Sequence, residues 1–309
     1  MDKQLVLGVD GGGTKTACVA IDLNGTVLGT GQSGSANYHN VGKETAYANV
    51  QQAIQQTLTL ANSSFDDVGS ICLGIAGVDR LNDRKIVAKW VERLLPNTPY
   101  QLHNDAVIAL ASGTGGKLHG IVVICGTGMI VYGIDHQGQH HRVAGRGPLL
   151  GDDGGGYNIG INTLKAITAA HDGMGPKTML TQTVFAHLKL NTVDDLLTWT
   201  YRDTSWHRIA QLSQLTQTCA NAGDVVAGQL VAQAADALFL AISAILTKLD
   251  DGEHQPIPLP LVLAGGNLRP GPLNDALTKR LLDHAPLLNV IRPTVEPVMG
   301  AAYLALGKV

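Results

Sequence analysis

The chain has few cysteines, no excess of basic residues and no long uninterrupted apolar run. It has four cysteines in 309 residues, and their spacing includes no Cys-x-x-Cys pair, which argues against zinc ribbons and disulfide frameworks. The net charge of −3 leaves no basic footprint for nucleic acid. No apolar run reaches about 18 residues without interruption, so we expect no membrane span. The apolar stretch 225–249 is interrupted by polar residues, and we expect a core helix there.

The remaining bulk properties describe a globular protein. Hydrophobic residues make up 45% of the chain and charged residues 15%, and the length allows two domains of ordinary size. Residues 1–4 lead directly into an apolar strand, so we expect no signal peptide. A cysteine spacing that argues against a disulfide framework fits a reducing compartment, and we expect a cytoplasmic location.

Glycine, with 37 residues, is abundant, and its most informative cluster lies in Gly8–Thr16. Apolar stretches at 4–7 and 17–21 flank this segment, which predicts a glycine-rich turn between two strands. Glycines allow close backbone approach and let several N–H groups point at one phosphate. The turn offers backbone N–H groups, a hydroxyl, an ammonium group and a carboxylate that suits hydrated Mg²⁺, from Gly11, Gly12, Gly13, Thr14, Lys15 and Asp10.

Two other phosphate-binding loops do not fit this segment. A dinucleotide fingerprint needs a third glycine where Thr16 stands, and a P-loop needs Gly-Lys-Ser/Thr rather than Gly13-Thr14-Lys15-Thr16. Both also need a helix after the loop, whereas a β-type run follows here. An ordinary hairpin turn stays open as the simpler interpretation, although three consecutive glycines are unusual in one.

The pattern occurs twice. Residues 4–31 give a strand, the glycine turn, a strand, an Asn24-Gly25 turn and a strand; residues 121–143 repeat this order around Gly126-Thr127-Gly128. This repetition predicts a duplicated domain, in which two loops could hold opposite sides of one polyphosphate.

Strands and helices alternate along the rest of the chain, which predicts an α/β fold. Hydrophobic spacing predicts further strands at 68–75, 100–103, 259–263 and 288–291, and helices at 44–61, 83–95, 106–112 (capped by Asp105), 157–170, 177–188, 193–200, 205–222, 224–249, 272–284 and 298–306.

Six segments in one order carry a family resemblance: Gly8–Thr14, Ala76–Arg80, Asn104-Asp105-Ala106, Gly126–Gly128, Gly147–Asp152 and Asp172–Thr178. Together they resemble the N-acetylglucosamine kinase branch of the BadF/BadG/BcrA/BcrD ATPase family, within the actin, sugar kinase and 70-kDa heat-shock superfamily. The resemblance implies two duplicated actin-like (ribonuclease H-like) domains, each with a mixed sheet, and an interdomain cleft. We expect domains at 1–115, joined by the helix 298–309, and at 116–297.

The resemblance also implies site residues. Asp105 corresponds to the family's catalytic base, although local sequence alone equally favours a helix N-cap. Asp10 is expected to hold Mg²⁺ through water. ATP is expected to contact Gly11, Gly12, Gly13, Thr14, Lys15, Gly126, Thr127, Gly128, Ala210, Gly265, Gly266 and Asn267. The sugar is expected to contact Asn37, Asp105, Gly145, Arg146, Gly147 and Asp152. Ordinary loop or turn roles stay open for Asn37, Asp152 and the Gly265–Asn267 segment.

The sequence departs from the family pattern beside the expected sugar pocket. Met129 stands where relatives carry serine, and Arg146 replaces an aromatic residue. Because arginine suits carboxylates, we hypothesise a preference for an acidic sugar such as N-acetylmuramic acid; an exposed arginine without a substrate role is the alternative.

The resemblance implies an ATP- and Mg²⁺-dependent kinase acting on the 6-hydroxyl of N-acetylglucosamine or a related hexosamine, as a homodimer without nucleic-acid or membrane partners. Glucosamine or N-acetylmuramic acid kinase activity is an alternative. So is an activator-type ATPase of the same family, which needs cysteines presented for an iron–sulfur cluster.

Overall fold

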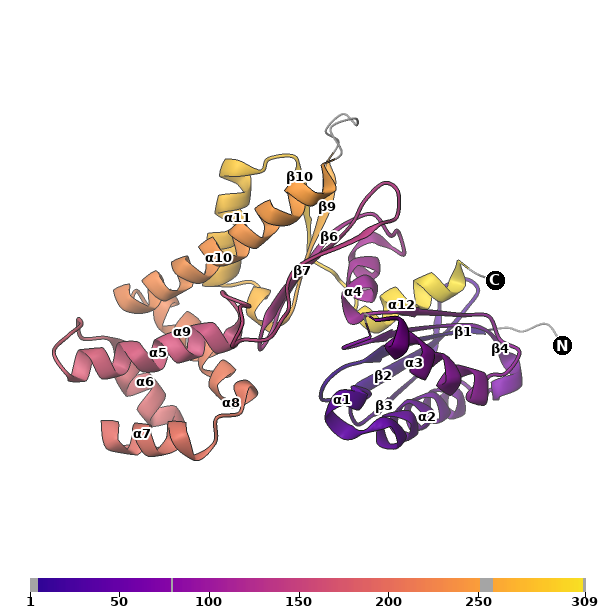
Figure 1. The fold of residues 1–309 in the computed structure, drawn as a ribbon, viewed down its shortest axis with the longest axis horizontal. Helices are drawn as coiled ribbons and strands as arrows, with labels where there is room; N and C mark the ends of the chain where they lie inside the picture. Colours follow the sequence, from indigo (N-terminus) through magenta and orange to yellow (C-terminus); the bar gives the residue numbers. More distant parts are fainter. Residues whose placement is uncertain (1–4, 79, 251–257, 308–309) are drawn as a thin grey trace. The chain divides into compact units, whose positions relative to one another are not determined.

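The computed structural model describes residues 5–78, 80–250 and 258–307. The chain forms two compact units, one of residues 1–122 with 291–309 and the other of residues 123–290. Each unit contains a five-stranded sheet flanked by helices (Figure 1). The chain enters the second unit within strand β6 (Gly120–Cys125).

The first unit is built around a mixed sheet of order β3-β2-β1-β4-β5. Strand β1 pairs antiparallel with β2 and parallel with β4, and β5 continues the parallel part. Its elements are β1 (Leu5–Gly11), β2 (Thr16–Asp22), β3 (Val27–Ser33), α1 (Tyr38–Val41), α2 (Lys43–Leu60), η1 (Phe65–Asp67), β4 (Val68–Ile75), α3 (Leu81–Leu94), β5 (Tyr100–His103), α4 (Asp105–Thr114) and α12 (Pro297–Leu306).

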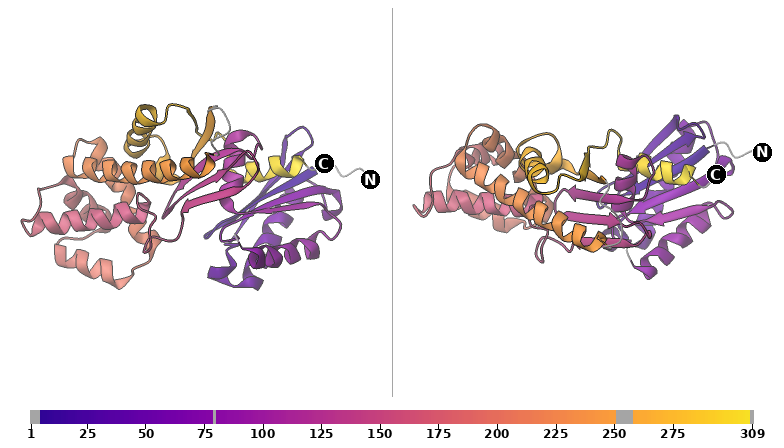
Figure 2. Two further views of the ribbon diagram at one scale, coloured as in Figure 1. Left: turned by 45° about the horizontal axis from the view of Figure 1, so that its top comes forward. Right: turned by 90° about the horizontal axis from the view of Figure 1, so that it is seen from above.

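Alternation along β1 assigns its side chains to two helical layers. Leu5, Leu7 and Val9 belong to one buried cluster with side chains of α2 and α3. Gly8 faces the opposite layer, where a Cβ would lie 2.4 Å from the backbone nitrogen of Ala302 in α12. Glycine at this position therefore allows α12, which comes from the far end of the sequence, to pack directly on the first strand (Figure 2).

The second unit has a sheet of order β10-β9-β6-β7-β8. Read from β8, this order matches that of the first sheet, with β6 in the place of β1, which confirms the predicted duplication. Its elements after β6 are β7 (Met129–Ile134), β8 (His140–Ala144), α5 (Gly156–His171), α6 (Met179–Leu188), α7 (Val193–Arg202), α8 (Trp206–Ala210), α9 (Leu212–Asn221), α10 (Val225–Leu249), β9 (Leu259–Ala264), η2 (Gly266–Leu268), α11 (Pro272–His284) and β10 (Leu288–Ile291).

Helices α5 to α9 gather at one end of the second unit and have their own buried cluster (Figure 1). The long helix α10 connects this end to the sheet, since it packs against α5, α9 and α11 and against β7 and β8 (Figure 2). Among the described residues α10 alone is long and apolar enough to cross a membrane. One face of it, from Ala227 to Ile245, is buried within the unit, as expected for a core helix.

The structure differs from the sequence-based expectation in three places. The helix predicted at 205–222 is two helices, α8 and α9, which meet at Gln211. The one-turn helix α1 lies in a segment where the sequence predicted no helix. The cap of α4 is Asn104, whose side chain accepts from Val107 N at 3.0 Å, so the prediction that Asp105 caps this helix was wrong.

Candidate functional site

The glycine turn of the first unit is closed by its own backbone. Gly12 N donates to the Lys15 carbonyl oxygen at 2.8 Å, while the buried hydroxyl of Thr16 donates to the Gly34 carbonyl oxygen at 2.7 Å. Thr14 and Lys15 are exposed at the tip of the turn. The turn therefore presents a hydroxyl and an ammonium group on a fixed backbone, as a phosphate site requires.

Three parallel strands end beside this turn. In the register of the sheet, Asp10 lies opposite Gly74 of β4, and Gly74 lies opposite His103 of β5. Asp105 follows His103 by two residues. The carboxyl ends of parallel strands form the usual ligand-binding edge of such sheets, and both predicted catalytic-site carboxylates lie there.

The two carboxylates interact. The pKa of Asp10 is raised to about 6, chiefly by burial and next by the negative charge of Asp105; Lys15 lowers this pKa and Glu296 adds a smaller increase. A half-buried carboxyl whose charge is resisted by a second carboxylate favours a nearby cation. Among the described residues there is no cluster of three or more histidine, cysteine or acidic side chains that could hold a metal ion alone.

Asp105 opens α4 and is partly exposed. Asn104 supplies the N-cap of α4. The interpretation of Asp105 as the helix cap therefore no longer holds, and capping does not account for its carboxylate. The carboxylate thus lies at the first turn of a helix, on the ligand-binding edge of the sheet.

Asn37 is connected to the glycine turn through one side chain that the sequence did not single out. The hydroxyl of Ser35 donates to the Gly12 carbonyl oxygen at 3.0 Å and accepts from Asn37 N at 3.1 Å. Ser35 is buried. The glycine turn and the predicted sugar-binding asparagine are therefore neighbours within the first unit, although 23 residues separate Gly12 from Ser35.

Gly77 of the Ala76–Arg80 motif lies next to this segment. It has a φ of +82°, and a Cβ there would lie 3.7 Å from the Asn37 amide atoms. Asp79 of the same motif lies outside the described residues. The motif thus contributes a close backbone approach beside Asn37.

In the second unit the Gly126–Gly128 turn is attached to the start of α5. Gly156 N donates to the Gly126 carbonyl oxygen at 2.8 Å, and Tyr157 N donates to the Thr127 carbonyl oxygen at 2.8 Å. Gly126 N closes the turn on the Gly128 carbonyl oxygen at 3.0 Å. The two halves of the duplicated fold therefore each hold a rigid glycine turn at the end of the equivalent strand.

Asn267 is the centre of a buried network around this second turn. Its Nδ2 donates to the Gly126 carbonyl oxygen at 2.8 Å, and its Oδ1 accepts from the Ser213 hydroxyl at 2.7 Å and from Gln214 Nε2 at 2.9 Å. The side chain is only 4% exposed. Asn267 therefore supports the turn from behind, while the neighbouring backbone of Gly266 is exposed.

Gly156 shows how closely the predicted nucleotide-binding residues of this unit gather. A Cβ at Gly156 would lie 2.8 Å from both Asn267 Nδ2 and the Gly126 carbonyl oxygen, and 3.2 Å from the Ala210 carbonyl oxygen. Gly265, with a φ of +95°, passes closer still to the backbone of Cys125, where a Cβ would lie 2.3 Å from the carbonyl oxygen. Residues from four distant segments thus converge at one place, and the sequence did not point to Gly156 itself.

Asp152 organises the predicted sugar-binding loop of the second unit. It is 6% exposed, and its carboxylate accepts from Arg146 N at 2.9 Å and from Gly147 N at 3.2 Å. It also lies directly beside Gly128. Gly145 has a φ of +67° in the same loop.

Two further features of this loop bear on recognition of a sugar. The side chain of Arg146 is exposed. Trp206, at the start of α8, lies against Gly147, where a Cβ would be 3.6 Å from the indole ring. An aromatic ring therefore lies beside the loop even though Arg146 replaces the aromatic residue of the family pattern.

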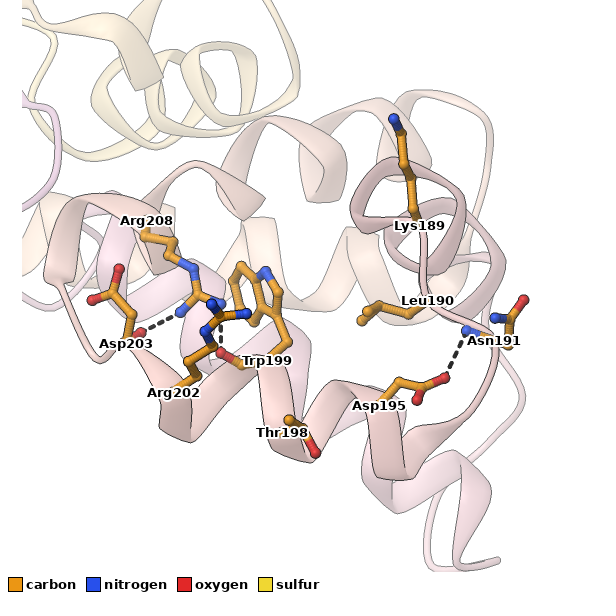
Figure 3. A pocket seen from close by; sticks show the side chains of 9 residues that line it. All are labelled: Lys189, Leu190, Asn191, Asp195, Thr198, Trp199, Arg202, Asp203 and Arg208. Carbon is orange, nitrogen blue, oxygen red and sulfur yellow. Dashed lines mark hydrogen bonds between the residues drawn. The ribbon is translucent and has the colours of Figure 1, made fainter.

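A separate pocket of about 520 Å³ lies among α6, α7 and α8 (Figure 3). Its acidic side chains accept hydrogen bonds from nearby backbone N–H groups: Asp195 accepts from Thr192 N, and Asp203 accepts from Ser205 N. Arg208 lies 3.5 Å from the Trp199 ring and donates to two backbone carbonyl groups. The pocket is lined by Lys189, Leu190, Asn191, Asp195, Thr198, Trp199, Arg202, Asp203 and Arg208. None of the predicted site residues is among them.

The sequence profile of the BadF/BadG/BcrA/BcrD ATPase family matches residues 7–305 of the chain. The chain is 43% identical to the N-acetyl-D-glucosamine kinase of Dictyostelium discoideum, over 99% of each chain. It is 33% identical to the N-acetylmuramic acid/N-acetylglucosamine kinase of Clostridium acetobutylicum, over 97% of each chain.

A solved structure shares the fold. It is a protein from Chromobacterium violaceum assigned as an N-acetylglucosamine kinase, with a TM-score of 0.74, 24% identity and coverage of 97% of this chain and 98% of that one. The match over nearly the whole length, together with the duplicated sheets and their glycine turns, shows that the chain belongs to the BadF/BadG/BcrA/BcrD ATPase family.

Proposed function

We propose that the protein is an ATP-dependent sugar kinase that phosphorylates the 6-hydroxyl of N-acetylglucosamine or a closely related amino sugar. The observation that carries this proposal is the arrangement in the first unit, where Asp105 and Asp10 lie on one sheet edge beside the glycine turn. The 43% identity to the Dictyostelium kinase supports the choice of acceptor.

The reaction assigns a role to each group. The sugar hydroxyl oxygen attacks the γ-phosphorus, its proton passes to the Asp105 carboxylate, and the bond to the β-phosphate oxygen breaks as ADP leaves. The backbone of Gly11–Gly13 and the hydroxyl of Thr14 hold the phosphates, and Lys15 offsets their charge. In the second unit, Gly126–Gly128 and the exposed backbone of Gly265 and Gly266 bind the nucleotide, while Asn267 supports the Gly126–Gly128 turn from behind.

The residues fit a magnesium ion held through water. Asp10 provides one half-buried carboxylate whose charge is resisted by Asp105, and a cation would relieve that repulsion. The ion would neutralise charge on the phosphate oxygens. We propose that Asp10 would hold the ion through bound water, with the ATP phosphates supplying the other oxygen ligands.

An acidic amino sugar is a second candidate acceptor. Arg146 is exposed on the loop that Asp152 organises. The Clostridium relative is named as a kinase of N-acetylmuramic acid as well as of N-acetylglucosamine. A guanidinium group at this place could pair with a lactyl carboxylate, which a neutral sugar lacks.

The activator-type ATPase is disfavoured by the cysteines. All four are buried, in β2, β4, β6 and α9, and burial raises the pKa values of Cys18, Cys72 and Cys125 to about 12. Thiols in these places cannot be presented at a subunit interface for an iron–sulfur cluster. Iron content and a brown colour in the purified protein would revive that function.

We further propose that the protein works in the cytoplasm as a homodimer, as buried free thiols and the family resemblance suggest. Light scattering coupled to gel filtration would measure the oligomeric state, and a monomer at working concentration would contradict this part.

The central test measures ADP release with Mg²⁺-ATP and each of N-acetylglucosamine, glucosamine, N-acetylmuramic acid, N-acetylmannosamine and glucose. We expect turnover with one amino sugar and a loss of about 10³-fold or more in Asp105→Asn, because the general base is removed. Asp66→Asn, an exposed change in the same unit, is the matched control. ATP hydrolysis whose rate depends on none of these sugars and is unchanged in Asp105→Asn would overturn the proposal.

A further inference from the structure

The segment that holds Asn37 has little stability of its own. Helix α1 has four residues, far too few to persist without tertiary contacts. Asn37 is its N-cap, with Oδ1 accepting from His39 N at 3.1 Å. The orientation of the Asn37 amide therefore depends on what holds α1 in place.

Tyr38 attaches α1 to α3. Its ring is buried and meets Trp90 of α3 edge-on, with ring centroids 6.1 Å apart. Its hydroxyl donates a hydrogen bond to Asp83 Oδ1, also in α3. One side chain thus attaches the short helix to a long one through both packing and a charge-assisted hydrogen bond.

Asp83 is placed to receive this bond. It is 7% exposed, and its other oxygen, Oδ2, accepts from Arg80 N at 3.2 Å, which anchors the carboxylate at the start of α3. His39 Nε2 lies 3.8 Å from Asp83 Oδ1. Burial and the Asp83 carboxylate raise the pKa of Tyr38 to about 12, so its hydroxyl remains a donor at neutral pH.

We infer that Asp83 and Tyr38 are positioning residues for the acceptor sugar, acting by holding Asn37 in its binding orientation. This inference rests on the proposed function, because Asn37 is the residue proposed to bind the sugar. Nothing in the sequence motifs pointed to Asp83, which stands 46 residues after Asn37 along the chain.

The predicted signature is a separation of kinetic constants. In Tyr38→Phe and in Asp83→Asn, KM for the acceptor sugar should rise about tenfold, while KM for ATP and kcat change by less than about twofold. The double variant should raise KM no further than the stronger single variant, because both remove one interaction.

Two matched controls separate positioning from general destabilisation. Tyr47→Phe alters a tyrosine that packs on the same Trp90, with ring centroids 6.4 Å apart. Asp67→Asn alters another aspartate of a capping box in the same unit. Both should leave KM for the sugar unchanged, and melting temperatures of all variants should be recorded alongside.

Unchanged KM for the sugar in Tyr38→Phe and Asp83→Asn would overturn the inference, as would an equal rise in both KM values. If the wild-type protein turns over no amino sugar, the proposed function itself has failed. Amide hydrogen exchange at Val41 and Gly42 then still tests the positioning: it should be faster in Tyr38→Phe than in wild type or Tyr47→Phe. Equal exchange in all three would overturn the inference independently of activity.

Discussion

Asn267 donates from Nδ2 to the carbonyl oxygen of Gly126 at 2.8 Å, across 141 residues of sequence. The bond joins the segment after β9 to the turn after β6, and these are the equivalents of β4 and β1 in the first unit. Because the same amide also accepts from two side chains of α9, it sets the position of the Gly126–Gly128 turn.

Asn267→Ala should therefore weaken nucleotide binding. We expect KM for ATP to rise at least about tenfold and the free energy of unfolding to fall by ~2 kcal/mol, since buried partners lose their hydrogen bonds. KM for the sugar should change much less. Steady-state kinetics and urea unfolding measure these effects.

Asn274→Ala is the matched control. Asn274 is also fully buried and donates to the Leu268 carbonyl oxygen at 2.7 Å, but the turn at Gly126 does not depend on that bond. It should lower stability by a similar amount without a comparable rise in KM for ATP. Equal effects of the two variants on KM would contradict a specific role for Asn267.

Asp224 joins two helices of the second unit. It caps α10 by accepting from Ala227 N at 2.8 Å, and it accepts from Met179 N at 2.7 Å at the start of α6. Asp224→Ala should lower the free energy of unfolding by ~2–3 kcal/mol, because two backbone groups and the Thr178 hydroxyl lose a charged partner. Asp283→Ala, at an exposed position of α11, should change it by less than ~0.5 kcal/mol.

The same carboxylate should give a pH dependence. Burial tends to raise the pKa of Asp224, but the hydrogen bonds from Ala227, Met179 and Thr178 outweigh it and hold the pKa below its ordinary value. A lowered folded-state pKa means that the stabilisation is complete above the unfolded-state pKa and is lost as the pH falls through the folded one. The stability difference between wild type and Asp224→Asn should be constant from about pH 5 to 8 and shrink below about pH 4. A difference that grows with acidification would contradict this assignment.

Ser70 in β4 offers a stabilising substitution. Among the described residues, its Oγ is the one buried side-chain polar atom without a hydrogen-bond partner. Ser70→Ala should leave stability unchanged or raise it by up to ~1 kcal/mol, because no bond is lost and a buried polar group is removed. Ser33→Ala, which loses a bond of 2.6 Å to the Asn49 carbonyl oxygen, should be destabilising in the same urea experiment.

Arg146→Trp tests the acidic-sugar hypothesis. If the guanidinium pairs with a carboxylate, the ratio of kcat/KM for N-acetylmuramic acid to that for N-acetylglucosamine should fall about tenfold. Arg202→Trp, at an exposed position of α7, should leave the ratio unchanged. An unchanged ratio in Arg146→Trp would show that this arginine has no role in acceptor choice.

Three residues of the site that sequence reasoning missed share one property. No local motif marks these residues, which are Ser35, Gly156 and Trp206. Each contacts a partner 23 to 59 positions away in the sequence, respectively Gly12, Gly126 and Gly147. Asn104 was missed for a local reason, since two adjacent residues could each cap α4 and propensity does not choose between them. No glycine or proline near Gln211 predicts the break between α8 and α9.

The sequence by itself determined the α/β architecture and its duplication, because hydrophobic periodicity and glycine-rich turns are local signals that survive without a partner segment. It also indicated the two glycine turns as candidate phosphate-binding loops, and the family resemblance indicated Asp105 as a candidate base. Only the tertiary structure decided that Asp10 and Asp105 share one sheet edge, that Asn267 supports its turn from behind, and that Tyr38 bonds to Asp83. These relationships depend on strand register and helix packing, which bring together residues that no local pattern connects.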